Sequence, residues 1–141
     1  MNKIISYKDY KYSIKNIFSF LKLNNNQQDL FIKSIKIEKT SDYFLLPVCN
    51  LHLNDKSILK KICEWRNKFH YTFDPPIKTN IANTKKWLKN NVLKKEDKIL
   101  FLVMDINNMP IGHIGFANCF NKNLTFEIDN VLRGEKVKNK L

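Results

Sequence analysis

Arginine is nearly absent from this strongly basic chain of 141 residues. Only Arg66 and Arg133 are arginine among 25 basic residues, although the formal net charge is +12. Proteins that read bases or clamp phosphates favour arginine for its bidentate fork, and the lysines here are scattered rather than gathered in a stripe. We therefore interpret the charge as solvated lysine and rank nucleic-acid binding as the weaker alternative. A role for the charge in attracting an anionic ligand stays open.

Paired cysteines, metal-ligand spacings and long apolar runs are also lacking. The cysteines are odd in number and far apart: Cys49, Cys63 and Cys119. This spacing predicts reduced thiols that fill the core, and the three histidines suggest no metal site. No apolar run approaches the roughly 18 residues of a membrane helix, and the opening "MNKIISYKDYKYSIKN" is too polar for a signal peptide. We expect a cytoplasmic protein without a membrane partner.

A hydrophobic content of 43% with ten phenylalanines is typical of one globular domain. Residues 1–41 are predicted to form an N-terminal helical extension. In it, "YKYSIKNIFSFLKL" has helical apolar spacing, and "QQDLFIKSIKI" is interpreted as a second short helix. The apolar run from Asp42 to Leu53 predicts a strand, with an edge position or a kink at Pro47.

Two helices are predicted after this strand. In "NDKSILKKICEWRNKF", Asn54 or Asp55 can cap a helix with an apolar face at Ile58, Ile62, Trp65 and Phe69. Pro75 and Pro76 break the pattern. The segment "NTKKWLKNNVLKKED" then predicts a helix that turns Trp87, Leu88 and Val92 inward.

The remaining segments predict a three-stranded antiparallel meander. Its strands are "KILFLVMD" (98–105), "PIGHIGFANCF" (110–120) and "LTFEIDNVL" (124–132), joined by the turns "INNM" and "NKN". The third strand alternates, with Leu124, Phe126 and Ile128 on one face and Thr125, Glu127 and Asp129 on the other. The predicted fold class of residues 42–141 is therefore α+β, with a strand, two helices and a meander.

Four short segments in this order resemble the GNAT acetyltransferase superfamily, and most of all its branch of ribosomal-protein and amino-sugar N-acetyltransferases. They are "EWRN" (64–67), "KKWL" (85–88), "DINNMPIGHIGF" (105–116) and "EIDNVLRG" (127–134). The resemblance covers Asp42 to Glu135 and implies the N-terminal half of that domain. It also implies acetyl transfer from acetyl-CoA to a primary amine of a small molecule, an amino sugar or a protein.

The resemblance assigns a role to several residues, each with a structural alternative. Glu127 is the candidate general base, with Asp129 behind it, and the alternative for both is a solvated strand residue. Val131, Leu132 and Arg133 would offer backbone groups to the acetyl and pantetheine portions of the cofactor, or else simply pair in the sheet. The candidate acceptor-site residues, with core or loop packing as their alternative, are Arg66, Asn67, Tyr71 and Phe73. We interpret His113 as a hydrogen-bonded structural histidine.

The family's pyrophosphate cradle is a Q/R-x-x-G-x-G/A loop that follows the fourth strand and opens a helix. Here Arg133-Gly134-Glu135 is followed only by "KVKNKL". We therefore expect a domain truncated before this loop, weakly active or inactive as this chain. The alternative is a catalytically silent remnant that acts as an interaction module. We also expect the isolated chain to be marginally stable, and either to self-associate or to need a partner at the unpaired edge near Val131 and Leu132. The sheet face carrying Thr125, Glu127 and Asp129 is expected to lose its cover as well.

Overall fold

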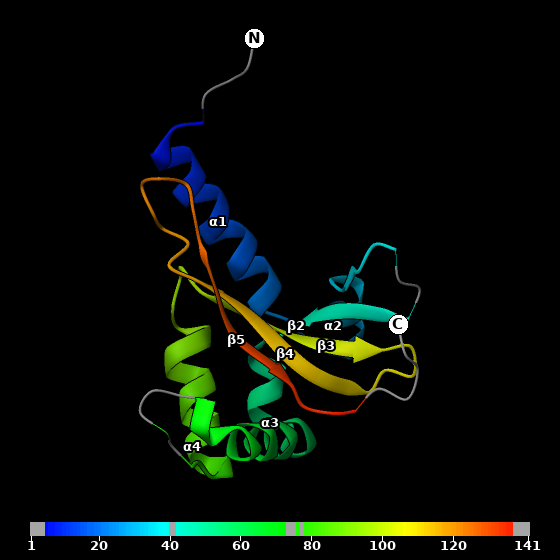
Figure 1. The fold of residues 1–141 in the computed structure, drawn as a ribbon. Helices are drawn as coiled ribbons and strands as arrows, with labels where there is room; N and C mark the ends of the chain where they lie inside the picture. The colour runs from blue at the N-terminus through cyan, green and yellow to red at the C-terminus, as the bar shows by residue number, and fades with distance from the viewer. Residues whose placement is uncertain (1–4, 40–41, 73–75, 77, 137–141) are drawn as a thin grey trace.

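The computed structural model describes residues 5–39, 42–72, 76 and 78–136 as helices around one antiparallel sheet, an α+β arrangement (Figure 1). The helices are α1 (Tyr7–Lys22), α2 (Gln27–Ile32), α3 (Lys56–Lys68) and α4 (Ile81–Trp87), which continues as a π-helical turn over Leu88–Leu93. Short 3-10 turns cover Asn50–Asn54 and His70–Thr72. The strands are β1 (Ile35–Lys36), β2 (Tyr43–Pro47), β3 (Ile99–Asp105), β4 (Pro110–Ala117) and β5 (Glu127–Arg133).

The strands follow the sheet in chain order, β1-β2-β3-β4-β5. The predicted meander is confirmed as β3, β4 and β5, and the predicted strand before the two helices is β2. The second predicted N-terminal helix is wrong at its end, because α2 stops at Ile32 and Ile35–Lys36 pair with β2 instead. The β-branched Ile35 suits an extended strand, and pairing opposite Leu45 outweighs the weak helical pattern.

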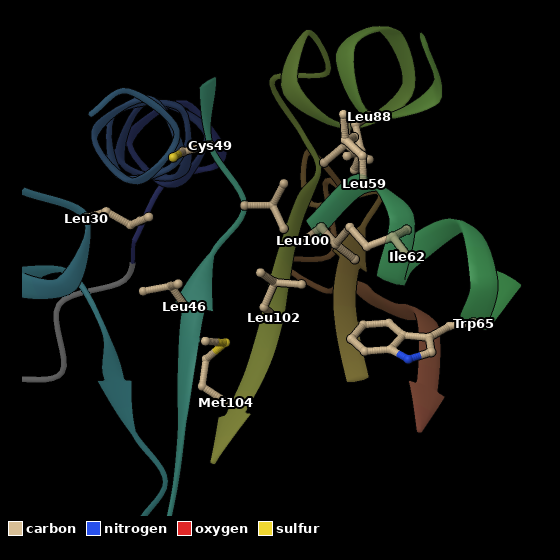
Figure 2. Packing of buried hydrophobic residues seen from close by; sticks show 12 residues of the cluster. Leu30, Leu46, Cys49, Leu59, Ile62, Trp65, Leu88, Leu100, Leu102 and Met104 are labelled. Atoms are coloured by element: carbon tan, nitrogen blue, oxygen red, sulfur yellow. The ribbon is translucent and has the colours of Figure 1, made fainter. Parts of the chain in front are cut away.

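Alternate residues of β3 face two different layers. Leu100, Leu102 and Met104 point toward α3 and α4, where they pack with Ile62 and Trp65 (Figure 2). On the other face of β3, Ile99 and Phe101 form a second cluster with Phe18 and Leu21 of α1 and with Cys119. The sheet is therefore a middle layer with α1 on one side and α3 with α4 on the other (Figure 1).

Helix α3 forms as its sequence predicts. The Asp55 side chain accepts a hydrogen bond from the Ile58 N–H and caps the first turn. Ile62 and Trp65 are buried on the predicted apolar face. The three cysteines are free and buried, which confirms their prediction as core residues.

The buried Lys22 joins the N-terminal helix to the end of the second helical layer. Its Nζ donates to the carbonyl oxygens of Val92 at 3.0 Å, near the end of the π-helical turn, and of Lys95 at 2.6 Å, just after it. These carbonyls are at a helix C-terminus, where backbone acceptors are left over and a positive charge is favourable. Burial lowers the pKa of Lys22 to about 8. Lys22 thus ties α1 to the segment that leads into β3.

The strand predicted over Asp42 to Leu53 is wrong in its second half, which is a 3-10 turn. There the Cys49 N–H donates to Nδ1 of the buried His52, and this local bond replaces strand pairing. Strand β1 pairs only with Phe44 and Leu45, so in the described part of the chain Pro47 faces no partner strand on that side. The proline therefore lies where its missing N–H is tolerated.

Strand β5 begins later than predicted and does not alternate throughout. Leu124 has a φ of 58° and belongs to the turn. Further on, Gly115 pairs with Asp129 while His113 pairs with Leu132, so β5 has one residue more than β4 over this stretch. Asn130, with a φ of 48°, lies in this β-bulge. The simple alternation predicted from Leu124 to Leu132 therefore breaks at Asn130.

Candidate functional site

A polar cleft of about 440 Å³ opens between the end of α4 and the β4–β5 pair. Its wall contains the aromatic side chain of Trp87 and five charged side chains. These are Lys95, Asp97, Lys98, Glu127 and Asp129. The three carboxylates and two ammonium groups lie at the side of the sheet that faces α3 and α4, so the cleft suits a small polar or cationic group.

The two carboxylates that β5 contributes to the cleft differ in their surroundings. Glu127 is exposed, and its Oε2 accepts a hydrogen bond from Nδ2 of Asn118 at 2.8 Å. Asp129 is half-buried, and its Oδ2 lies 3.1 Å from Nζ of Lys98. The Asp129 Oδ1 is buried, with no hydrogen-bond partner among the residues that the structure describes. Glu127 is thus open to solvent, whereas Asp129 is held close to the backbone of Gly115.

Arg66 connects helix α3 to the bulge of β5. Its Nη1 donates to Oδ1 of Asn130 at 3.3 Å. The guanidinium also lies over the ring of Trp87, with 3.9 Å from Cζ to the ring centroid. Burial lowers the pKa of Arg66 from its ordinary value, but an arginine remains charged at neutral pH. The positive charge therefore lies between the polar cleft and the bulge.

The buried side chain of His113 contacts the backbone of the bulge. Its ring Nδ1 lies within hydrogen-bond distance of the Asn130 carbonyl oxygen, and the indole of Trp65 packs beside it. Burial lowers the pKa of His113 to about 4, and the charge of Arg66 acts in the same direction. At neutral pH the imidazole is therefore uncharged. The expectation of a hydrogen-bonded structural histidine is confirmed.

The structure separates the residues that the resemblance placed in the acceptor site. Asn67 points to the loop before α4, where its side chain bonds both the N–H and the carbonyl of Thr79. The exposed Tyr71 contacts the rings of Phe69 and His70 instead of the cleft. Phe73 lies outside the described residues. Of the four acceptor candidates, Arg66 lies beside the polar cleft.

The residues predicted to contact the cofactor lie along the outer strand. Val131 and Arg133 are exposed, and Leu132 is half-buried opposite His113. Val131 and Leu132 directly follow the bulge residue. In the described part of the chain no strand pairs with the far side of β5, so the predicted edge is confirmed.

Sequence reasoning missed several residues that shape this site. Lys98 was assigned to a strand but lines the cleft. Trp87 packs against the core as predicted, and its contribution to the cleft wall was missed. The only available signal for Asn130 was its residue type, because asparagine adopts positive φ more readily than most residues. A hydrogen bond from Trp65 Nε1 to Glu135 Oε1, at 3.0 Å, likewise had no sequence signal.

Comparison with known proteins gives no relative: no family model, no curated protein and no solved structure matches the chain. Over the described ranges, no helix has both the length and the apolar character to cross a membrane. In the same ranges, no group of three or more histidine, cysteine, aspartate and glutamate side chains is placed to hold a metal ion. The candidate site therefore has to be interpreted from its own geometry.

Proposed function

We propose that the chain provides the N-terminal half of a GNAT-type N-acetyltransferase domain, with acetyl-CoA as the acyl donor and a primary amine as the acceptor. The observation that carries the proposal is the β5 bulge at Asn130, which lies between the polar cleft and the open edge of Val131 and Leu132. The element order supports it as well: strand β2, helices α3 and α4, then the β3–β4–β5 meander.

Such a bulge suits acyl transfer for a physical reason. The extra residue interrupts the regular hydrogen-bond ladder, so a backbone N–H near Asn130 can point away from the partner strand. A fixed backbone N–H of this kind can stabilise the negative charge that develops on a thioester oxygen. Arg66 and His113 hold the Asn130 side chain and carbonyl, and this limits movement of the bulge.

The polar cleft is the proposed acceptor site. Asp97, Glu127 and Asp129 offer carboxylates to an ammonium group, and the exposed Glu127 is the candidate base that removes its proton. The acceptor class stays open between a small amine and a protein amine. Within residues 1–141 no G-x-G/A sequence follows β5, so we expect the pantetheine end, rather than the pyrophosphate, to supply the contacts of this chain with the cofactor.

Equilibrium disulfide exchange tests the proposal without requiring tight binding. The three native cysteines are buried, so Val131→Cys introduces an exposed thiol beside the bulge. When each disulfide is buffered by a fixed excess of its own thiol, pantetheine disulfide should modify this introduced thiol several-fold more than cystamine does, as measured by intact mass. The matched control is Ile32→Cys on α2, a site that is 77% exposed, where the two disulfides should react equally. Equal modification at both sites would contradict a pantetheine-binding edge.

A further inference from the structure

The open edge of β5 carries an uncovered apolar stripe on the face opposite the polar cleft. Phe126, Ile128 and Val131 are 55%, 62% and 61% exposed. Ile128 pairs with Phe116, which belongs to the α1 side of the sheet, and the Phe126 ring contacts the Phe116 ring at 5.2 Å. Helix α1 covers β3 and β4 on this face but leaves β5 bare. On the other face, Glu127 and Asp129 line the cleft beside α4. Thr125 and Glu127 are exposed there, as expected for a face without cover, whereas Asp129 is half-buried.

This stripe is continuous with the apolar cluster between α1 and the sheet. The rings of Phe101, Phe116 and Phe126 follow one another across β3, β4 and the start of β5, each in edge contact with the next. The first ring is buried and the last is exposed. An apolar surface that extends a core to an unpaired strand is a typical site for adding a further strand.

We propose that the β5 edge binds the β5 edge of a second copy of this chain, as an antiparallel pair that continues the sheet. The bulge places Ile128 and Val131 on one face and Asp129 and Asn130 on the other. An antiparallel pairing that sets Ile128 opposite Val131 of the second copy therefore keeps like faces together. It sets Phe126 opposite the exposed Arg133, a favourable cation–π partner, and Asp129 opposite Asn130. A two-fold axis repeats each contact.

The charge pattern of this region allows two basic chains to meet here. No lysine lies between Lys122 and Lys136, and the segment contains Glu127, Asp129 and Glu135 against the single Arg133. Edge strands that avoid pairing usually carry lysine or proline, and β5 carries neither. Two chains of net charge +12 repel elsewhere, so salt should strengthen this contact by screening. Binding through shared nucleic acid would weaken with salt.

A contact between two single edge strands buries little surface and belongs to the weak class of interfaces. Sedimentation velocity over about 5 to 500 µM, a range suited to weak association, therefore tests the pairing. The wild-type chain should shift from monomer toward dimer with concentration, and more so at high salt. Ile128→Lys should remain monomeric at every concentration. Ile17→Lys, at a 51% exposed site on α1, should dimerise like the wild type. A wild-type monomer throughout, or equal dimerisation of both variants, would overturn the proposal.

Cross-linking tests the register of the proposed dimer, in which Ile128 of one chain lies opposite Val131 of the other, without measuring the strength of dimerisation. In a mixture of Ile128→Cys and Val131→Cys chains, mild oxidation should give mainly the mixed cross-linked dimer. The buried native cysteines should contribute no cross-link. A statistical mixture, in which the mixed dimer is only twice as abundant as either homodimer, would contradict the register. The pairing and the proposed cofactor site share Val131, but the two proposals can fail separately. Ile128 lies outside the proposed cofactor and acceptor residues, so loss of dimerisation in Ile128→Lys would not decide the disulfide-exchange result at position 131.

Discussion

At the residue scale, two buried histidines are held neutral by their surroundings. His52 and His113 are 2% and 1% exposed, and burial lowers the pKa of each to about 4. The unfolded chain binds a proton at each histidine near pH 6.5, whereas the folded chain does not until about pH 4. Stability therefore falls as the pH drops through this window, and the loss is complete below about pH 4. Each histidine contributes on the order of 3 kcal/mol to that loss at the limit.

We expect His52→Asn to flatten this pH dependence. Asparagine offers an oxygen where Nδ1 of His52 accepts the Cys49 N–H, so the local bond is retained while the titrating ring is removed. Chemical unfolding at a series of pH values from neutral down to about pH 4 should show a smaller decrease in the free energy of unfolding for the variant than for the wild type. Parallel curves for the two proteins would contradict this expectation, whatever their difference in stability at neutral pH.

At the element scale, Lys22 makes α1 part of the folded unit. Lys22→Met keeps most of the aliphatic stem but leaves the carbonyls of Val92 and Lys95 without this donor. Each carbonyl keeps one backbone N–H donor, that of Lys95 for Val92 and that of Lys98 for Lys95. The variant therefore loses two hydrogen bonds from a charged group, and we expect a net loss of about 1–3 kcal/mol at neutral pH once the relief of a buried charge is subtracted.

The matched control for this prediction is Lys15→Met on the same helix. Lys15 forms an exposed ion pair with Glu96 at 3.5 Å, and exposed pairs contribute little. Thermal unfolding should therefore show a clear decrease in Tm for the Lys22 variant and almost none for the Lys15 variant. Equal Tm values for Lys22→Met and wild type would mean that the cost of burying the charge cancels its hydrogen bonds.

The elements differ in how well the sequence predicts them. Helix α3 and strands β3 and β4 follow from apolar periodicity, because each buries a regular face. The two-residue β1 and the bulge at Asn130 do not, since both depend on the register in which a neighbouring strand pairs. For the site, Glu127 and Arg66 were predicted and lie in or beside the polar cleft. The hydrogen bonds of the Asn67 side chain to the backbone of Thr79 could not be predicted, because they have no signature in composition or spacing.

At the scale of the whole molecule, the sheet is covered by helices on both faces at its centre and is open at β5. The polar cleft, the bulge and the apolar stripe all involve β5, which Figure 1 shows beside β4 as the outer strand. The proposed cofactor contacts at Val131 and Leu132 and the proposed pairing of a second copy involve the same edge. We therefore expect acetyl-CoA at high concentration to oppose dimerisation.

The most direct test of the proposed function is an amide-resolved NMR titration of the unmodified chain with acetyl-CoA at up to millimolar concentration. We predict chemical-shift changes concentrated at Asn130 to Arg133 and at the cleft residues Asn118 and Glu127. ATP, which shares the polyphosphate charge but lacks pantetheine, should leave these amides unchanged. Dilute protein keeps the chain monomeric and separates cofactor binding from pairing. Unperturbed β5 amides at millimolar acetyl-CoA, or the same pattern with ATP, would contradict an acetyl-CoA site at the bulge.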